Sequence, residues 1–173
     1  MHEGLIALRL NDGAYAQVPA VNLQSKTFTL AFRVSGMGQK DIQPVFGDWP
    51  STDNGNFMFL FKKQKLQISR RADGATWHYI NTTTVTNGIH HIAVTWNAQE
   101  VTIFLDGKRK ETTSMEKKYF EGTANNGEWF DIGKTGDHSM NGWLYELFLA
   151  NTVLTEEEIY KLAFQGMFIC RVD

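Results

Sequence analysis

Residues 47–56 form an oxygen-rich stretch that could bind a hard metal ion. The stretch contains the carboxylates Asp48 and Asp53 and the amides Asn54 and Asn56, together with glycine and proline. Carboxylate and amide oxygens are the ligands that calcium prefers in proteins. The same residue types also fill turns for backbone reasons alone, so a turn without a metal ion is an equal alternative.

Flat side chains could stack on the apolar face of a sugar ring or anchor a protein partner. We predict ligand contacts for Trp49, Trp77, His78, Tyr79 and His138. Trp49 is the strongest candidate, because it lies between an aspartate and a proline in the polar stretch just described. Trp129 offers another flat face, whereas Trp96 and Trp143 fit the alternation of a core and are predicted to be buried. Packing within the protein is the alternative for each candidate.

Acidic residues do not show the spacing of a glycoside hydrolase. Such an enzyme uses two carboxylates around one bond, and residues of a strand share a face only at even spacing. Glu128 and Asp131 are three positions apart and should face opposite sides of a strand. No Gly-x-Ser-x-Gly motif is present. The sequence predicts no enzyme, with a hydrolase that uses a rim acid such as Asp48 or Asp137 as the alternative.

Histidine and cysteine give no metal or redox motif. His90 and His91 are consecutive in an expected strand and therefore face opposite sides, which prevents them from binding one ion. Cys170 is the single cysteine, so an internal disulfide and a Cys-x-x-Cys site are excluded. We expect Cys170 to be a semi-buried small apolar residue, with a free thiol or a bond to another chain as alternatives.

Composition excludes further classes of function. The 17 basic and 19 acidic residues give a formal charge of -2 at pH 7, so there is no electrostatic case for nucleic acid as a partner. Apolar runs are much shorter than the roughly 20 residues that cross a bilayer, and we expect no membrane insertion. The 173 residues, 42% of them hydrophobic, are predicted to form a single domain over 1–173.

Alternating polarity predicts a fold made almost wholly of strands. Apolar residues at 28, 30, 32 and 34 alternate with residues at 29, 31 and 33 that should face water, and 91–96 repeat the pattern. A polar turn at 97–100 and a strand over 101–105 complete a hairpin, which ends at Asp106-Gly107 with residues that tolerate positive φ. Further strands are expected over 5–10, 14–18, 57–61, 66–70, 77–80, 129–132 and 143–149. Thr155 and Glu158 fit the capping box of one helix over about 156–164.

Several stretches occur in a recognisable order along the chain. They are 8–19 (LRLNDGAYAQVP), 88–96 (GIHHIAVTW), 101–108 (VTIFLDGK), 130–133 (FDIG), 141–147 (NGWLYEL) and 154–159 (LTEEEI). Together they resemble the first hairpin, the central hairpin and the closing strand and helix of laminin G-like and pentraxin-like domains, which are members of the concanavalin A-like lectin/glucanase superfamily. Ile89 stands where those families typically have a tryptophan. The resemblance implies an all-β, two-sheet antiparallel jelly-roll sandwich with one short C-terminal helix.

The resemblance also implies how such a domain would act. In pentraxin-like relatives an Asp-Asn pair before a strand and a late acidic loop bind calcium, which implies Asp53, Asn54 and Asp137 as metal ligands here. It implies an extracellular recognition module that binds a glycan or a glycoprotein or protein partner through rim loops. The triplet Asn81-Thr82-Thr83 is a glycosylation signal, which agrees with secretion. The alternative is a structural or adhesion module that forms a homo-oligomer through sheet edges or faces.

Overall fold

The computed structural model describes residues 7–11, 13–19, 27–36, 40–47, 57–71, 77–97, 100–114 and 129–165. At positions 57, 70, 71, 77–79 and 81–83 the description covers the backbone alone. The elements, in chain order, are β1 (Leu8–Leu10), β2 (Ala16–Pro19), β3 (Phe28–Ser35), β4 (Ile42–Gly47), β5 (Phe57–Lys62), β6 (Lys65–Arg71), β7 (Trp77–Thr84), β8 (His90–Asn97), β9 (Glu100–Leu105), β10 (Lys108–Ser114), β11 (Trp129–Ile132), β12 (Lys134–Thr135), β13 (His138–Ser139), β14 (Gly142–Ala150) and α1 (Glu156–Gln165).

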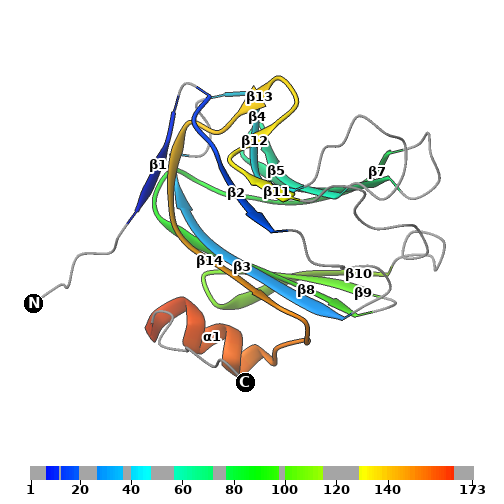
Figure 1. Cartoon of the computed structure of the whole chain (residues 1–173). Helices are drawn as coiled ribbons and strands as arrows, with labels where there is room; N and C mark the ends of the chain where they lie inside the picture. The colour runs from blue at the N-terminus through cyan, green and yellow to red at the C-terminus, as the bar shows by residue number, and fades with distance from the viewer. Residues whose placement is uncertain are drawn as a thin grey trace, which may run out of the picture.

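Two six-stranded antiparallel sheets lie face to face, with α1 on the outside of one of them (Figure 1). Sheet A has the order β1-β14-β3-β8-β9-β10, and sheet B has the order β2-β11-β4-β5-β6-β7. Strands β12 and β13 form a separate two-stranded hairpin. This arrangement confirms the predicted antiparallel sandwich with a short helix near the C-terminus, and the β8–β9 pairing confirms the central hairpin.

The interpretation of residues 8–19 as a hairpin is wrong. Strand β1 pairs with β14 in sheet A, whereas β2 pairs with β11 in sheet B. The chain therefore passes from one sheet to the other between these strands. A turn makes this passage, with the amide of Ala14 donating to the carbonyl of Asn11 at 2.8 Å and Gly13 at a φ of 87°.

The main core fills the space between the sheets, and strand alternation determines which residues enter it. In β3 the inward residues are those at 28, 30, 32 and 34, as the sequence predicts, and in β8 they are Ile92, Val94 and Trp96. Phe28 stacks on Trp96 with ring centroids 5.4 Å apart. Sheet B contributes Phe59, Phe61 and other large side chains to the same core.

The outer faces of β3 and β8 are buried as well, so the prediction that they face water is wrong. Thr29, Ala31, His91, Ala93 and Thr95 are all buried on this side. The reason is α1, whose Ile159 and Leu162 pack with Ala31, Ala93 and Phe104 in a second cluster. The helix itself begins with the predicted capping box and ends within one residue of the predicted position.

Two tight turns use residues with positive φ. Asp106 and Gly107, at 51° and 73°, connect β9 to β10. The sequence analysis placed the end of a strand here but missed β10, the strand that follows the turn. Lys63 and Gln64, at 49° and 66°, connect β5 to β6 in the same way. Positive φ at both central residues is what a type I′ hairpin turn requires.

Candidate functional site

Strand register brings two of the predicted ligand-binding stretches to one end of sheet B. Gly47 at the end of β4 pairs with Met58 near the start of β5, and Phe57 pairs with Arg70 near the end of β6. Arg71 in turn pairs with Trp77 at the start of β7. The loop 48–56, with Trp49, Asp53 and Asn54, leaves from this same end, although these residues lie outside the described part of the chain.

The predicted residues of β7 do not share one face. Trp77, His78 and Tyr79 pair with Arg71, Arg70 and Ser69 respectively. Because consecutive strand positions belong to opposite faces of a sheet, positions 77 and 79 belong to one face and position 78 to the other. A single ligand on one face of sheet B would therefore meet either positions 77 and 79 or position 78.

Asp137 and His138 lie on the β12–β13 hairpin, and both are exposed. The hairpin packs against β4, with the Thr135 hydroxyl donating to the Met58 sulfur at 3.1 Å. Lys40, just before β4, donates to the Ser139 hydroxyl at 3.1 Å. Within the described ranges no group of three histidine, cysteine, aspartate or glutamate side chains is placed to bind a metal ion.

An exposed strip runs along the outer face of β2 and β11, and we call it the β2–β11 strip. It consists of Gln17 of β2, Trp129 and Asp131 of β11, Tyr15 just before β2 and Lys134 of β12; Tyr15, Gln17 and Trp129 are exposed, whereas Asp131 and Lys134 are half-buried. Tyr15 and Trp129 are 47% and 49% exposed. Between them the Gln17 amide donates to Asp131 Oδ1 at 2.9 Å, and the Lys134 Nζ lies 4.7 Å from the Tyr15 ring centroid.

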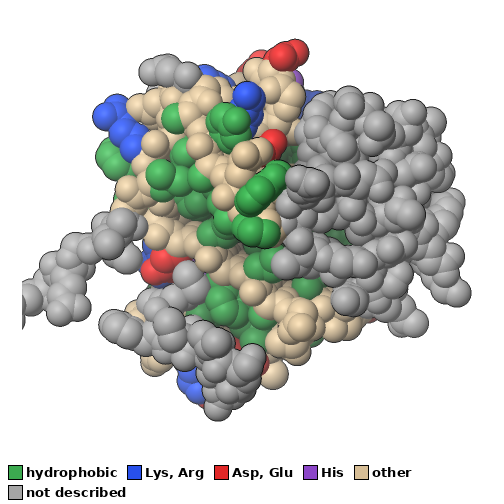
Figure 2. All heavy atoms as spheres, in the orientation of Figure 1, with side chains coloured by type: hydrophobic (Ala, Val, Ile, Leu, Met, Phe, Trp, Pro, Cys, Tyr) green, Lys and Arg blue, Asp and Glu red, His purple; other side chains and the backbone are tan. Residues whose placement is uncertain are grey.

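Alternation explains why Tyr15, Gln17, Trp129 and Asp131 share a face. Their strand neighbours, such as Val18, Phe130 and Ile132, pack into the core, so the residues between them face outward. Pairing of Trp129 with Pro19 and of Asp131 with Gln17 fixes the spacing along the strip. Figure 2 shows hydrophobic side chains scattered among backbone and other side-chain atoms on the face of the molecule where β2 lies in Figure 1.

The strip continues across sheet B as one register row. From Asp131 the pairing passes to Gly47, then to Met58 and Ser69. Gly47, Met58 and Ser69 are buried, and Thr135 covers the Met58 sulfur. Access to the outer face of sheet B is therefore open at the β2–β11 edge and closed over β5 and β6.

A family model described as the concanavalin A-like lectin/glucanases superfamily matches residues 10–160. The chain belongs to this superfamily. The match confirms the resemblance predicted from the sequence, and it includes β2, β11 and the β12–β13 hairpin. No functionally curated protein matches the sequence.

Solved structures of botulinum neurotoxins share the concanavalin A-like sandwich. The DC binding domain in complex with rat synaptotagmin II has a TM-score of 0.72 at 14% identity, with 94% of this chain and 43% of that chain covered. A type C structure, described with cell entry that depends on two ganglioside molecules, has a TM-score of 0.68 at 15% identity and coverages of 89% and 40%. The receptor binding domain of neurotoxin D has a TM-score of 0.72 at 10% identity and coverages of 94% and 44%. The present chain thus spans about two fifths of these toxin chains, and the likeness shows a common fold.

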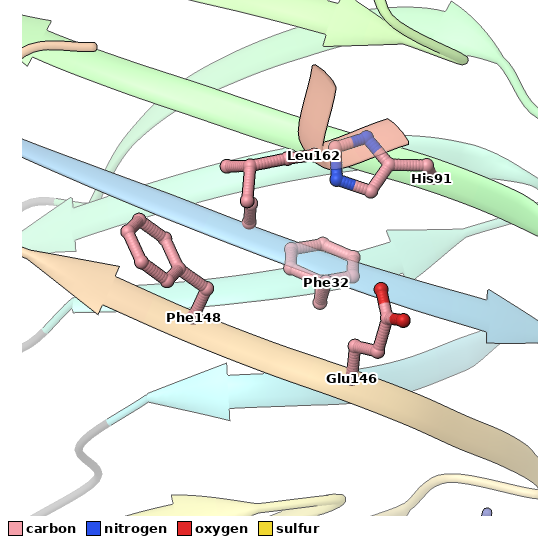
Figure 3. Close-up of a pocket in the computed structure, with 6 residues that line it drawn as sticks. Phe32, His91, Glu146, Phe148 and Leu162 are labelled. Atoms are coloured by element: carbon pink, nitrogen blue, oxygen red, sulfur yellow. The ribbon is translucent and has the colours of Figure 1, made fainter. Parts of the chain in front are cut away.

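On the other side of the sandwich, a narrow hollow lies between sheet A and α1 (Figure 3). It is too narrow to admit a water molecule, and its lining includes His91, Glu146, Phe148 and Leu162. Burial, followed by the nearby Arg33 guanidinium, lowers the pKa of His91 to about 4. His91 is therefore a neutral core residue at pH 7.

Trp143 is 40% exposed, so the prediction that it is buried is wrong. It lies opposite Arg9 of the edge strand β1, with the guanidinium carbon 5.4 Å from the ring centroid. Sequence reasoning also missed Tyr15, Gln17 and Lys134. The alternation over 14–18 was the available signal, but it did not show which strand would pair with β2.

Proposed function

We propose that this chain is a non-enzymatic recognition module that binds a glycan or a glycoprotein or protein partner through the open β2–β11 edge of the outer face of sheet B and the loops at the end of this sheet. The observation that carries the proposal is the β2–β11 strip, where two exposed aromatic rings flank a hydrogen-bonded amide and carboxylate. Binding sites commonly combine apolar surface with a few well-placed polar groups. The toxin structures support the proposal, since they were described with ganglioside and synaptotagmin binding.

The single carboxylate in the strands of sheet B favours binding over hydrolysis. Glycoside hydrolysis needs two carboxylates on either side of the scissile bond. Across the six strands of sheet B, as their described sequences show, Asp131 is the sole acidic residue.

No helix of the described ranges is long and apolar enough to cross a membrane.

A glycan array tests the recognition proposal directly. The purified chain is applied with calcium and again with EDTA, and a parallel capture experiment uses candidate glycoproteins before and after enzymatic deglycosylation. Binding to a defined set of glycans or glycoproteins is expected, without release of reducing sugar. Absence of binding in every arm, or release of sugar, would overturn the proposal.

We further propose that calcium assists binding through Asp53, Asn54 and Asp137. Titration calorimetry of the wild type should show calcium binding that Asp53→Asn and Asp137→Asn weaken. Glu157→Gln, which alters an exposed helix residue, is the matched control and should bind calcium like the wild type. Equal heats from all four proteins would contradict calcium binding by these residues. Glycan binding without calcium would then be tested by the EDTA arm of the array.

The extracellular location is part of the same proposal. It is supported by the superfamily and by the glycosylation signal at Asn81. Digestion of intact source cells with an added protease should remove the protein, or the medium should contain it. Full protection inside intact cells would contradict this location.

A further inference from the structure

The geometry points to the β2–β11 strip as a binding site for a neutral oligosaccharide that needs no metal ion. This inference rests on the proposed recognition function and names the site and the ligand class within it. It differs from the calcium proposal because none of Asp53, Asn54 and Asp137 belongs to the strip.

The shape of the strip suits a chain of sugar rings. From Tyr15 to Pro19 the strand advances about 13 Å, at roughly 3.3 Å per residue. Trp129 offers an exposed ring at one end of this length, and Tyr15 offers one at the other. A pyranose has an apolar C–H face and a rim of hydroxyl groups, so it can stack on a ring while its hydroxyls reach neighbouring polar atoms.

The middle of the strip supplies those polar atoms. The Gln17 amide donates to Asp131 Oδ1 at 2.9 Å, which fixes both side chains and leaves Asp131 Oδ2 and the Gln17 carbonyl to accept further hydrogen bonds. Both residues lie on paired strands, and sites built on strands hold their geometry better than sites built on loops. Sugar hydroxyl groups can donate hydrogen bonds to these two acceptors.

The charges of the strip favour a neutral ligand. Asp131 contributes one negative charge and Lys134 one positive charge, so the strip has no net charge to attract an acidic or a basic ligand. The Lys134 Nζ is also engaged by the Tyr15 ring, 4.7 Å from its centroid. An acidic sugar would have to place its carboxylate away from Asp131 and compete for this lysine.

The edge of the sheet argues against a protein strand as the occupant. Strand β2 is an edge strand, but it has only 4 residues. Its last residue, Pro19, has no amide hydrogen to donate to an added strand. An added strand would therefore form few backbone hydrogen bonds at this edge. A ligand would instead contact the side chains of the β2–β11 strip.

Titration with sugars in EDTA tests the inference. Cellohexaose, maltohexaose and lactose serve as neutral probes, and sialyllactose serves as the acidic probe. Titration calorimetry reports affinity, and amide chemical shifts of the 15N-labelled wild type report location. At least one neutral probe should bind, and the shifts should concentrate at residues 15–19 and 129–134.

Variants then separate the strip from the rest of the surface. Trp129→Ala and Asp131→Asn should each weaken binding roughly tenfold or more, the loss that follows from a removed stacking surface or charged hydrogen-bond acceptor. Trp143→Ala is the matched control, because Trp143 is a tryptophan of similar exposure on the opposite sheet. It should leave affinity within about twofold, since it removes no contact to the strip. Circular dichroism of each variant verifies that it is folded.

The outcomes distinguish this inference from the proposed function. Glycan binding that survives Trp129→Ala and Asp131→Asn, or that vanishes in EDTA, would overturn the strip as the site and leave the recognition function standing. Binding of sialyllactose alone, with loss in Lys134→Gln, would overturn the neutral ligand class. Binding of no glycan in this titration and on the array would overturn both the strip and glycan recognition.

Discussion

Asp106 and His91 are joined by a reciprocal pair of hydrogen bonds. The Asp106 amide donates to the His91 carbonyl at 2.7 Å, and the His91 amide donates to Asp106 Oδ1 at 3.0 Å. The second carboxylate oxygen of Asp106 is 2.9 Å from His90 Nδ1. A side chain thus extends the β8–β9 ladder one step beyond the end of β9 and holds the turn that faces α1.

Replacement of this carboxylate should destabilise the protein. Asp106→Ala leaves the His91 amide without its acceptor, and we expect the free energy of unfolding to fall by about 1–3 kcal/mol. Asp106→Asn keeps an acceptor oxygen and tolerates the positive φ at this position, so its loss should be smaller. Urea denaturation followed by tryptophan fluorescence measures both variants. An alanine variant as stable as the asparagine variant would show that the hydrogen bonds contribute little.

The buried His91 predicts a pH-dependent stability. Its pKa is lowered to about 4, chiefly by burial, whereas an unfolded histidine titrates near 6.5. Above pH 6.5 the ring is neutral in both states, so it adds no pH dependence. As the pH falls from 6.5 to 4, the unfolded state binds the proton first, and stability should decrease by about 3 kcal/mol over that window.

A histidine variant isolates this contribution. As the pH falls through this window, the free energy of unfolding of the wild type should decrease more than that of His91→Gln. His138→Gln changes an exposed histidine and serves as the control. Parallel pH curves for the wild type and His91→Gln would contradict the prediction.

The sequence predicted the sandwich because strand alternation is a local property. Positions 28–34 alternate as expected, and the inward residues form the core. Whether the opposite face of each strand is buried or exposed could not be predicted from the local sequence. Ala31 is buried because α1, well over a hundred positions later, covers it, whereas Trp143 is exposed although its strand shows a similar pattern. Alternation tells which residues share a face, but not which faces become covered.

The β2–β11 strip shows the same limit for the site. Gln17 and Asp131 are 114 positions apart, and their contact depends on which strands pair at the edge of sheet B. The sequence analysis judged Asp131 only as a possible partner of Glu128, three positions away. Trp129, two positions away, was the neighbour on the same face. The candidate residues of 48–56 are contiguous in sequence, so their residue types can be recognised without knowledge of the strand pairing.

The capping box of α1 gives a prediction with two readouts. Both the amide and the hydroxyl of Thr155 bond to Glu158 Oε2 at 2.8 Å, and these bonds lower the pKa of Glu158. Thr155→Ala should reduce the free energy of unfolding by about 1 kcal/mol. Titration followed by NMR should also show a rise in the pKa of Glu158. Thr155→Ser keeps the hydroxyl and should preserve both properties, so equal behaviour of the two variants would contradict this role.

Two glycines with similar backbone angles separate strain from crowding. Gly107 and Gly13 have φ of 73° and 87°, and alanine at either position should cost roughly 1–2 kcal/mol for the left-handed backbone. A Cβ at Gly13 would meet nothing within 4 Å, whereas a Cβ at Gly107 would lie 2.9 Å from Phe164 Cε2 and 3.2 Å from Ala163 Cβ. Gly107→Ala should therefore lose about 1 kcal/mol more than Gly13→Ala in urea denaturation, because the turn would press on α1.

A second substitution tests whether α1 is the source of this extra loss. Phe164 is 59% exposed, so Phe164→Ala alone should change stability little. In the Phe164→Ala background the cost of Gly107→Ala should decrease, but part should remain because the Tyr160 Cα also lies 3.3 Å from the added Cβ. An unchanged cost in that background would place the strain within the turn. A cost equal to that of Gly13→Ala in the wild-type background would show that the helix yields freely, and that the β9–β10 turn does not fix its position.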